Sequence, residues 1–292
     1  MKLIWQSKLV LLLVLPFAGA SMVLQAHWWA VNCWPVAVWT LGLSLLFGLV
    51  VLQLRAATPA AAFAGMAIAA CLMFSTVTFT PAEVIPYAPW HTALVPVLTV
   101  FLLAFLATRL GRESKERLGL GEQRHGRTAA QVAANLGIAA IVSSEPVQSW
   151  LIGGWFSRAS VTPMPLFAVG LAALAEAAAD TVSSEVGQVL GGRPRMLTTL
   201  RLVEPGTDGG VSLIGTLAGV AAACIVAAVG SLALGGGRTM FWISCAGAVF
   251  GLFFDSLLGA TLERRGWLNN DAVNFLSTAS AAGFALGVLA IL

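Results

Sequence analysis

The chain has 292 residues, of which 58% are hydrophobic and only 10% are charged, and its mean hydropathy is +0.88. Because a typical soluble domain has about 25% charged residues, this composition excludes an ordinary soluble protein and indicates an integral membrane protein. The net charge of +3 is small, but the basic residues are unevenly spread along the chain.

Apolar runs predict about nine membrane-spanning helices, because a span needs about 20 mainly apolar residues. The runs do not alternate and are rich in Ala, Leu and Gly, which favours helices over strands. In chain order they cover residues 9–25, 36–54, 58–78, 91–109, 128–145, 164–183, 212–234, 240–259 and 272–292. The predicted fold is an all-α, polytopic membrane helix bundle. Residues 1–90 would be N-terminal helices of unassigned role, and residues 91–292 would form the catalytic core.

The first 25 residues also have features of a cleaved signal peptide. Lys2 and Lys8 precede an apolar stretch, and the small residues AGA occupy positions 18–20. Because further apolar runs follow directly, we interpret this segment as the first span.

The positions of Lys and Arg predict the orientation of the chain. With nine spans, all but two of the 16 basic residues fall on the side that holds the N-terminus, and Arg158 and Arg238 fall on the other. The positive-inside rule then places the N-terminus in the cytoplasm and the C-terminus outside. The most basic connection, residues 109–127, suits contacts with anionic membrane lipids. No nucleic-acid partner is predicted, because no soluble domain or aromatic platform accompanies it.

Carboxylates are rare in the chain, but they gather at the predicted cytoplasmic ends of two spans. Asp180 and Glu185 end one span, with Glu176 deeper in it, and Asp255 followed by Ser256 ends another. Ionisable residues in membrane helices are costly and indicate function, although a structural hydrogen bond between helices is the alternative. Because Mg²⁺ prefers carboxylates, water and phosphate oxygens, we predict that Asp180, Glu185 and Asp255 are catalytic residues that bind Mg²⁺.

The predicted helices that leave the cytoplasmic side begin with glycine, amide or hydroxyl residues. The segment PGTDGGVS, residues 205–212, has glycines that let backbone amides approach a ligand, and helix N-termini favour anions. Together with the carboxylates, this pattern predicts a site for metal-bound phosphate. Local alternatives stay open: Asp208 as a turn residue, Glu185 and Glu204 as partners of arginines, and Asn269 or Asn270 as a helix cap.

Several linked segments resemble the transmembrane protein 19 family, which includes plant phytyl-phosphate kinase. They are GRTAAQVAAN (126–135), ADTVSSEVG (179–187), PRMLTTLRLVEPGTDGGVSLIGTLAG (194–219), FDSLLGATL (254–262) and NNDAVNFLST (269–278). The resemblance covers roughly residues 90–292 and leaves the preceding residues unexplained. It implies an all-helical membrane kinase, distantly similar to dolichol and phytol kinases. Such an enzyme transfers a phosphoryl group from a nucleoside triphosphate, often CTP, to an isoprenoid lipid monophosphate.

The resemblance also implies a set of residues that bind nucleotide and substrate. By position they are Gln131, Asn135, Thr181, Ser184, Gly187, Gly206, Thr207, Gly209, Gly210, Ser256, Gly259, Asn270, Asp271 and Asn274, beside the carboxylates Asp180, Glu185 and Asp255. Asp208 lies within the glycine segment, and Arg193, Arg195, Arg201, Arg264 and Arg265 are candidate clamps for phosphate. We expect the protein in the plasma (inner) membrane, with its active site facing the cytoplasm.

Two other functions remain open from the sequence. A cytidylyltransferase that forms a CDP-lipid would use similar carboxylate and phosphate chemistry, but it would release pyrophosphate. A transporter would fit the repeated pairs of spans, although transporter sites usually lie near the middle of the bilayer. Here the polar residues gather toward one side.

Overall fold

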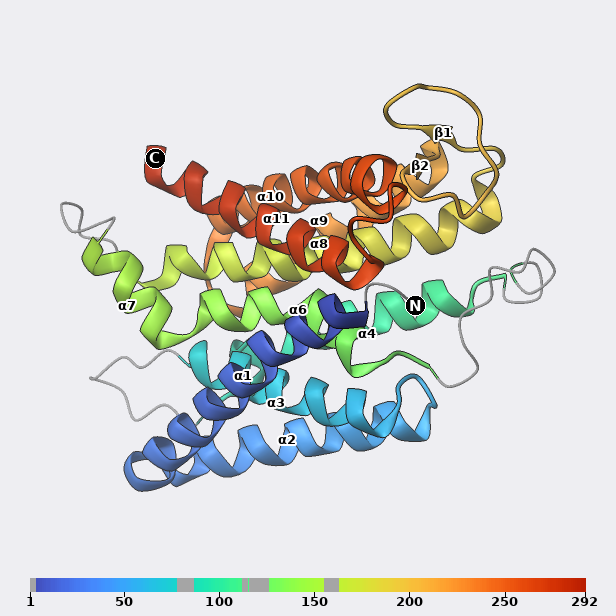
Figure 1. The fold of residues 1–292 in the computed structure, drawn as a ribbon. Helices are drawn as coiled ribbons and strands as arrows, with labels where there is room; N and C mark the ends of the chain where they lie inside the picture. The colour runs from blue at the N-terminus through green and yellow to red at the C-terminus, as the bar shows by residue number, and fades with distance from the viewer. Residues whose placement is uncertain (1–3, 78–86, 112–114, 116–125, 155–162) are drawn as a thin grey trace.

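The computed structural model describes residues 4–77, 87–111, 115, 126–154 and 163–292, and the regular structure within them is almost entirely helical. The helices run side by side as a bundle (Figure 1). The N-terminal part consists of α1 (Ile4–Asn32), α2 (Trp34–Gln53), α3 (Pro59–Ser75), the short 3₁₀ helix η1 (Pro89–His91) and α4 (Leu94–Arg109).

The described residues from 126 onward add six α-helices and a small hairpin. The helices are α6 (Ala129–Ser143), α7 (Glu145–Gly154), α8 (Pro163–Leu190), α9 (Leu213–Ala233), α10 (Gly237–Leu258) and α11 (Asn270–Ile291). A π-helix, η2 (Gly259–Glu263), continues α10. The hairpin pairs β1 (Arg195–Met196) with β2 (Gly210–Val211) in antiparallel register.

Polar caps define where several of these helices begin. The hydroxyls of Thr58, Thr128 and Ser212 accept hydrogen bonds from the first turns of α3, α6 and α9. The side chain of Asn269 does the same for α11. Such caps satisfy backbone N–H groups that have no partner within the helix. These capped helix starts lie at the end of the bundle that also carries the hairpin.

The protein is an all-α membrane protein, and each predicted apolar range overlaps one of these helices. Six of the described helices have the length and composition to cross a membrane. Helices α3, α4 and α6 have 17, 16 and 15 residues, which is shorter than the roughly 20 residues that a span needs. The number of nine spans therefore stays a prediction, as does the orientation of the N-terminus.

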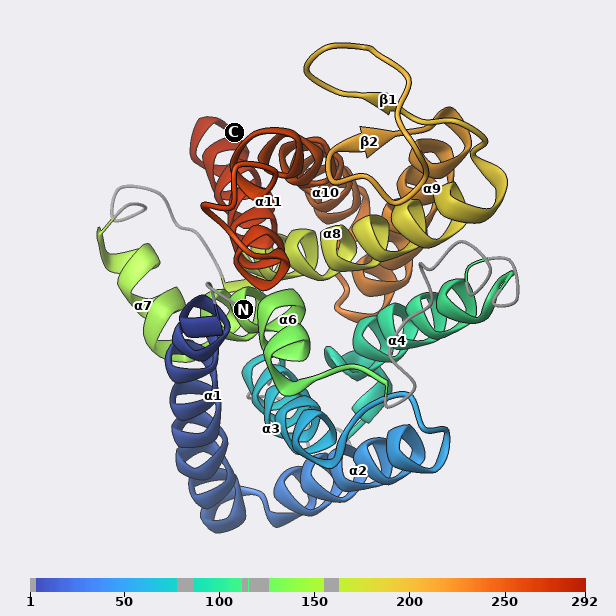
Figure 2. The ribbon, with the colours of Figure 1, turned by 45° about the vertical axis from the view of Figure 1, so that its right-hand side comes forward.

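Helix α8 lies at the centre of the bundle. It packs against α4, α6, α9, α10 and α11. In Figure 2, helices α9, α10 and α11 lie on one side of it and the N-terminal helices lie on the other. In the most apolar stretch of α8, 89% of the residues are buried inside the protein. Alanine is the most frequent residue at its buried positions, and small residues allow membrane helices to approach closely. The buried polar residues of α8, Glu176 and Thr181, therefore face other helices instead of lipid.

The N-terminal helices share the same core as the rest of the chain. Val14 of α1 and Ile68 of α3 are fully buried in one hydrophobic cluster with residues of α6 and α8. The start of α1 is also tied to α11: Ser7 Oγ donates to Asp271 Oδ2 at 2.6 Å, and Gln6 Nε2 donates to the Trp267 carbonyl at 2.8 Å. Residues 4–77 are thus packed into the bundle that carries the predicted site.

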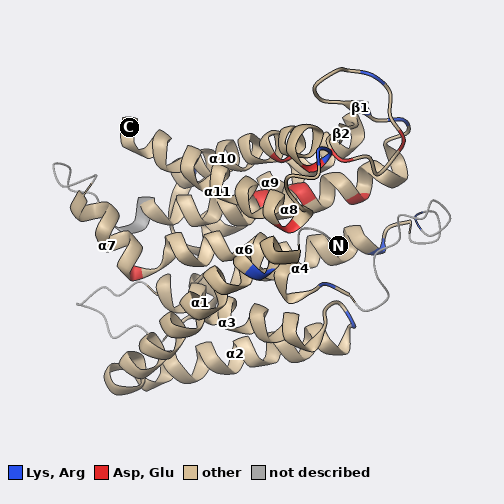
Figure 3. Ribbon diagram, in the orientation of Figure 1, with Lys and Arg blue, Asp and Glu red and all other residues tan. Residues whose placement is uncertain are grey.

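Most of the charged segments lie toward one end of the bundle. Figure 3 shows blue segments in the hairpin, at the end of α4 and in the connection between α2 and α3, with the red segments of α8 nearby. This arrangement agrees with the grouping of basic residues predicted from the sequence. Arg158, one of the two predicted exceptions, lies outside the described residues.

Candidate functional site

Four acidic side chains from three elements form what we call the carboxylate cluster: Glu176 and Asp180 of α8, Asp255 of α10 and Glu263 of η2. The carboxyl groups of Asp180 and Asp255 are close enough to share a hydrogen bond. Asp255 also interacts with Glu176 and Glu263, and Glu263 with Asp180. The expected approach of Asp180 and Asp255 is therefore confirmed, and it depends on α8 packing against α10.

Glu176 is the deepest member of the cluster. Its side chain is 1% exposed, one helical turn from Asp180. A Cβ added at Gly251 of α10 would lie 2.6 Å from Glu176 Cγ, so the glycine provides the space that the glutamate occupies. Ser277 of α11 lies beside both Glu176 and Asp255. Three helices thus enclose these carboxyl groups.

Two oxygens of the cluster lack partners. Among the described residues, Glu176 Oε1 and Asp255 Oδ1 are buried and accept no hydrogen bond. A buried polar atom without a partner costs about 1–3 kcal/mol, and several neighbouring carboxylates add mutual repulsion. A cation placed among them would offset both effects. Among the described residues, no group of three or more His, Cys, Asp or Glu side chains is arranged so that it could hold a metal ion.

The segment with Gly206, Gly209 and Gly210 is a turn that packs against η2. Gly206 and Gly209 have φ of +81° and +72°, a region that favours glycine. A Cβ at Gly209 would lie 2.2 Å from the backbone nitrogen of Ala260. The glycine at 209 is therefore required for contact between the turn and η2. Its predicted role in letting the backbone approach a phosphate stays a prediction.

Other groups in this turn already have partners within it. The hydroxyl of Thr207 donates to the Glu204 carbonyl at 2.7 Å, and the N–H of Gly210 donates to the Thr207 carbonyl at 2.9 Å. Asp208 is exposed, and partial desolvation raises the pKa of its carboxyl group above the usual range, while the nearby Arg264 guanidinium opposes that rise. The turn therefore brings Arg264 and Asp208 toward Glu263, the outermost member of the cluster.

Two of the predicted phosphate clamps lie in or next to β1. Arg193 and Arg195 are exposed, and Arg195 Nη1 donates to the Leu200 carbonyl at 3.0 Å. Arg264, by contrast, donates to Met196 Sδ at 3.4 Å, which ties η2 to β1. Of the predicted clamps, the described contacts bring only Arg264 next to an acidic residue of this region.

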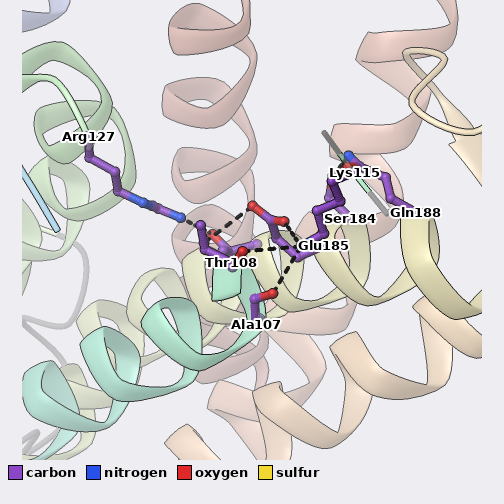
Figure 4. Close-up of polar contacts among 8 residues, drawn as sticks. Ala107, Thr108, Lys115, Arg127, Ser184, Glu185 and Gln188 are labelled. Atoms are coloured by element: carbon purple, nitrogen blue, oxygen red, sulfur yellow. Dashed lines mark hydrogen bonds and ion pairs between the residues drawn. The ribbon is translucent and has the colours of Figure 1, made fainter. Parts of the chain in front are cut away.

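A second polar group lies on the side of α8 that faces α4 (Figure 4). Glu185 forms an ion pair with Lys115 and accepts a hydrogen bond from Thr108 Oγ1 at 3.3 Å. Arg127 Nη2 donates to Thr181 Oγ1 at 3.3 Å, and Arg127 also interacts with Asp180. Glu185 therefore has a cationic partner of its own, and Arg127 connects this group to the carboxylate cluster.

The remaining predicted site residues of α6 and α8 differ in burial and in their contacts. Gln131 completes a capping box with Thr128, while Asn135 is 7% exposed within α6. Ser184 is exposed and accepts from Gln188 Nε2 at 3.3 Å. At Gly187, an added Cβ would lie 3.1 Å from Ser212 Oγ, so this glycine lets α8 approach α9. Gln131 and Gly187 thus have structural roles that the resemblance did not indicate.

The predicted site residues of α10 and α11 also make different contacts from one another. Ser256 donates to the carbonyl of Leu252 within its own helix at 3.3 Å. Asn270 is exposed, whereas Asp271 accepts the bond from Ser7 of α1. Asn274 is 9% exposed, one turn before Ser277. The contacts of Asp271 connect helices instead of lining the cluster.

Sequence reasoning did not select Lys115, Arg127, Glu263 or Ser277 as site residues. Lys115 and Arg127 lie in the basic connection that was interpreted as a topology signal. Glu263 was hidden among the arginines that follow it, and Ser277 looked like one more small residue of a span. Ser277 could have been selected from the sequence, because it is a polar residue inside an apolar run. The other three required knowledge of which helices are neighbours.

Comparison with known proteins places the chain among membrane proteins. The family model described as "Integral membrane protein DUF92" matches residues 42–282. The match begins within α2, earlier than the resemblance found from motifs. The family region therefore includes α3 and α4 as well as the helices of the carboxylate cluster.

Individual relatives are similar over part of the chain. The "Uncharacterized membrane protein MJ0933" of Methanocaldococcus jannaschii is 34% identical over 198 residues, which cover 67% of this chain and 75% of that protein. The "Uncharacterized membrane protein sll0875" of Synechocystis is 33% identical over 211 residues, covering 68% and 74%. "Protein VTE6, chloroplastic" of Arabidopsis thaliana is 31% identical over 186 residues, covering 62% and 54%. No solved structure matches the chain.

Proposed function

We propose that this chain, which belongs to the integral membrane protein DUF92 family, is a lipid phosphotransferase. It would transfer a phosphoryl group from a nucleoside triphosphate such as CTP to an isoprenoid lipid monophosphate, at the cytoplasmic face of the plasma (inner) membrane. The observation that carries the proposal is the buried carboxylate cluster with its unpaired oxygens, Glu176 Oε1 and Asp255 Oδ1. The substrate class is supported by the resemblance to the family that includes phytyl-phosphate kinase.

The cluster fits Mg²⁺ better than it fits an all-protein metal cage. Mg²⁺ commonly binds through one or two carboxylates, with waters and substrate phosphates as the other ligands. The neighbouring Asp180 and Asp255 supply such a pair, and we propose them as the metal ligands. Glu185 has Lys115 as its partner, so we propose that it positions this lysine. When bound, Mg²⁺ would neutralise charge on the donor phosphates.

The chemistry requires little from the protein beyond positioning and charge. An oxygen of the acceptor phosphate forms a bond to the γ-phosphorus of the donor, and the bond to the β–γ bridging oxygen breaks. The nucleoside diphosphate leaves with that electron pair, and the lipid becomes a diphosphate. No general base is needed, because the acceptor phosphate is already anionic. Arg127 and Arg264 lie beside acidic residues at this end of the bundle and offer positive charge to the phosphates.

A product analysis tests the proposal. The purified full chain in detergent is incubated with Mg²⁺, each nucleoside triphosphate in turn, and isoprenoid alcohols or monophosphates, and the products are identified by mass. We expect an isoprenoid diphosphate together with a nucleoside diphosphate. Release of pyrophosphate with a CDP-lipid would instead identify the cytidylyltransferase alternative. If no pair reacts and proteoliposomes move the lipid phosphate unchanged, the protein is a transporter and the proposal is wrong.

A further inference from the structure

A cavity lies on the other side of α8 from the carboxylate cluster. It has a volume of about 190 Å³ and is lined by residues of α2, α3, α4, α6 and α8 and of the segments between them. Its apolar wall includes Phe47 of α2, Gly65 of α3, and Val100 and Phe101 of α4. The family-model match also covers these helices. Residues before position 90, to which sequence reasoning gave no role, therefore build part of a ligand-sized space.

The polar part of the cavity wall is mainly cationic. Arg55, Arg109, Lys115 and Arg127 line it, and Glu185 is the acidic residue among the lining residues. Glu185 is paired with Lys115, and Arg127 interacts with Asp180. The excess of positive charge at the wall therefore comes from Arg55 and Arg109. An apolar wall joined to a cationic one matches a molecule with a hydrocarbon chain and an anionic head. Arginine is well suited to phosphate, since its guanidinium can donate two parallel hydrogen bonds.

The backbone at the cationic side is held in a specific conformation. Arg127 N donates to the Ala56 carbonyl, and Thr58 N donates to the Arg127 carbonyl, both at 3.0 Å. A Cβ at Gly126 would lie 2.6 Å from the carbonyl carbon of Ala56, so only glycine allows this approach. Arg55 adopts a φ of +52°, which is strained for a residue with a side chain. These contacts place two arginines from distant parts of the sequence at one cavity.

The cavity adjoins the carboxylate cluster through α8. Thr181 lines the cavity, and the preceding residue, Asp180, belongs to the cluster. Arg127 donates to the hydroxyl of Thr181 and also interacts with Asp180. An anionic head bound by Arg127 would thus lie next to the carboxylates that we propose for Mg²⁺.

We propose that this cavity binds the lipid monophosphate, with its hydrocarbon chain against the apolar wall and its phosphate against the arginines. Its identification as the acceptor site rests on the proposed function, whereas the binding of an anionic single-chain lipid does not. Residues of α2 and α3 then contribute to the choice of hydrocarbon chain, because Phe47 and Gly65 form part of the apolar wall.

Binding is measured on the full chain in detergent without nucleotide. The probes are farnesyl monophosphate, farnesol, inorganic phosphate and phosphatidate. We expect farnesyl monophosphate to bind at least about tenfold more tightly than each of the others, because the cavity matches one chain plus one phosphate. If farnesol bound as tightly as farnesyl monophosphate, the arginines would not be recognising a phosphate. Equal binding of phosphatidate would indicate a general site for membrane lipid, and either result overturns the proposal.

A pair of glycine variants tests the location. In Gly65→Leu, the added Cβ has room, 3.8 Å from Phe47 and 3.9 Å from Val132, and the rest of the side chain enters the cavity. We expect farnesyl monophosphate binding to fall at least about tenfold. Gly283→Leu on α11, where an added Cβ meets nothing within 4 Å, is the control and should bind normally. Unchanged binding by a folded Gly65→Leu protein would contradict the proposal.

A second pair keeps the test decisive if the first variant fails to fold. Arg55→Gln removes a charge from the cavity wall, and Arg238→Gln removes one from an exposed position at the start of α10. We expect about tenfold weaker binding for Arg55→Gln alone, the usual effect of losing a charged hydrogen bond. Equal affinities would overturn the proposal.

The binding test and the product analysis can contradict the cavity proposal and the proposed function separately. Weaker binding in Gly65→Leu without any phosphoryl transfer by the unaltered protein would support the cavity and contradict the proposed function. Normal transfer by folded Gly65→Leu and Arg55→Gln proteins would support the function and place the acceptor elsewhere.

Discussion

At the scale of single residues, the carboxylate cluster is a costly arrangement. Glu176 is 1% exposed, and one of its oxygens has no partner among the described residues. Asp180, one turn away, and Asp255 on the facing helix add further negative charge. Groups arranged in this way destabilise a fold unless a ligand compensates them. We therefore interpret the cluster as functional and expect its substitutions to affect activity and stability in different directions.

The first residue-scale prediction concerns Asp180→Asn. The amide has nearly the shape of the carboxylate, so the fold should persist, while lost metal binding should lower phosphoryl transfer about a thousandfold or more. Transfer rates are compared with those of Glu145→Gln, which changes an exposed carboxylate at the start of α7. Equal activities in the two folded variants would mean that the chemistry does not use the cluster.

The second prediction is that Glu176→Gln stabilises the protein while reducing its activity. The substitution removes one of several neighbouring carboxylates without changing the volume of the side chain beside Gly251. Less repulsion and desolvation should raise the thermal midpoint by roughly 2–4 °C, which corresponds to about 1 kcal/mol. Unfolding of the purified protein in detergent, measured without Mg²⁺, checks this. A lower midpoint would show that Glu176 makes a stabilising structural contact instead.

At the scale of elements, the hairpin turn and the π-helix form one unit. Gly209 lies against Ala260, and a Cβ added at the neighbouring Gly259 would lie only 2.8 Å from the Gly209 nitrogen. The π-helix η2 carries Glu263 toward Asp180. Short π-helical segments frequently occur at functional sites. The packing of the turn therefore determines where the outermost carboxylate of the cluster lies.

The element-scale prediction compares two glycines that share a backbone conformation. Gly209 and Gly192 have φ of +72° and +64°, so alanine at either position costs about 1 kcal/mol of backbone strain. Only Gly209 is also in contact with η2, whereas an added Cβ at Gly192 meets nothing within 4 Å. Gly209→Ala should make the hairpin more sensitive to protease and lower activity well below that of Gly192→Ala. Equal protease sensitivity would contradict the packing role.

At the scale of the whole molecule, two sites adjoin one central helix. The carboxylate cluster lies between α8, α10 and α11, and the cavity lies between α8 and helices α2, α3, α4 and α6. Arg127 connects them through its contacts with Thr181 and Asp180. A nucleotide at the first site and a lipid phosphate at the second would meet at this arginine. Under the proposed function, the N-terminal helices form part of the substrate site.

The whole-molecule prediction concerns orientation. If the basic end of the bundle faces the cytoplasm, a cysteine at Leu200 in the hairpin should react with an impermeant thiol reagent only after the inner side is exposed. A cysteine at Gly153 in α7 should react from outside. Both positions are exposed, and the native cysteines Cys33, Cys71, Cys224 and Cys245 are first replaced by alanine. Labelling of both positions from the same side would refute the predicted topology.

The sequence by itself determined the class of the protein and the approximate limits of its helices. Long apolar runs must become helices in a bilayer, because each backbone polar group needs a partner within its own segment. The same local logic identified Asp180, Asp255 and Glu176 as unusual, since a carboxylate in an apolar run is visible without a structure. It also located the glycines of residues 206–210, although not what they contact.

Only the tertiary structure decided which polar residues meet. Asp180 and Asp255 are brought together by the packing of α8 on α10, and Lys115 and Glu185 form an ion pair at the cavity wall. Gly209 and Asp271 contact η2 and α1, which no local pattern in the chain indicates. Helix periodicity describes the faces of one helix, but the neighbour of each face depends on how all the helices fit together. For this reason the cavity lined by residues before position 90 was invisible in the sequence.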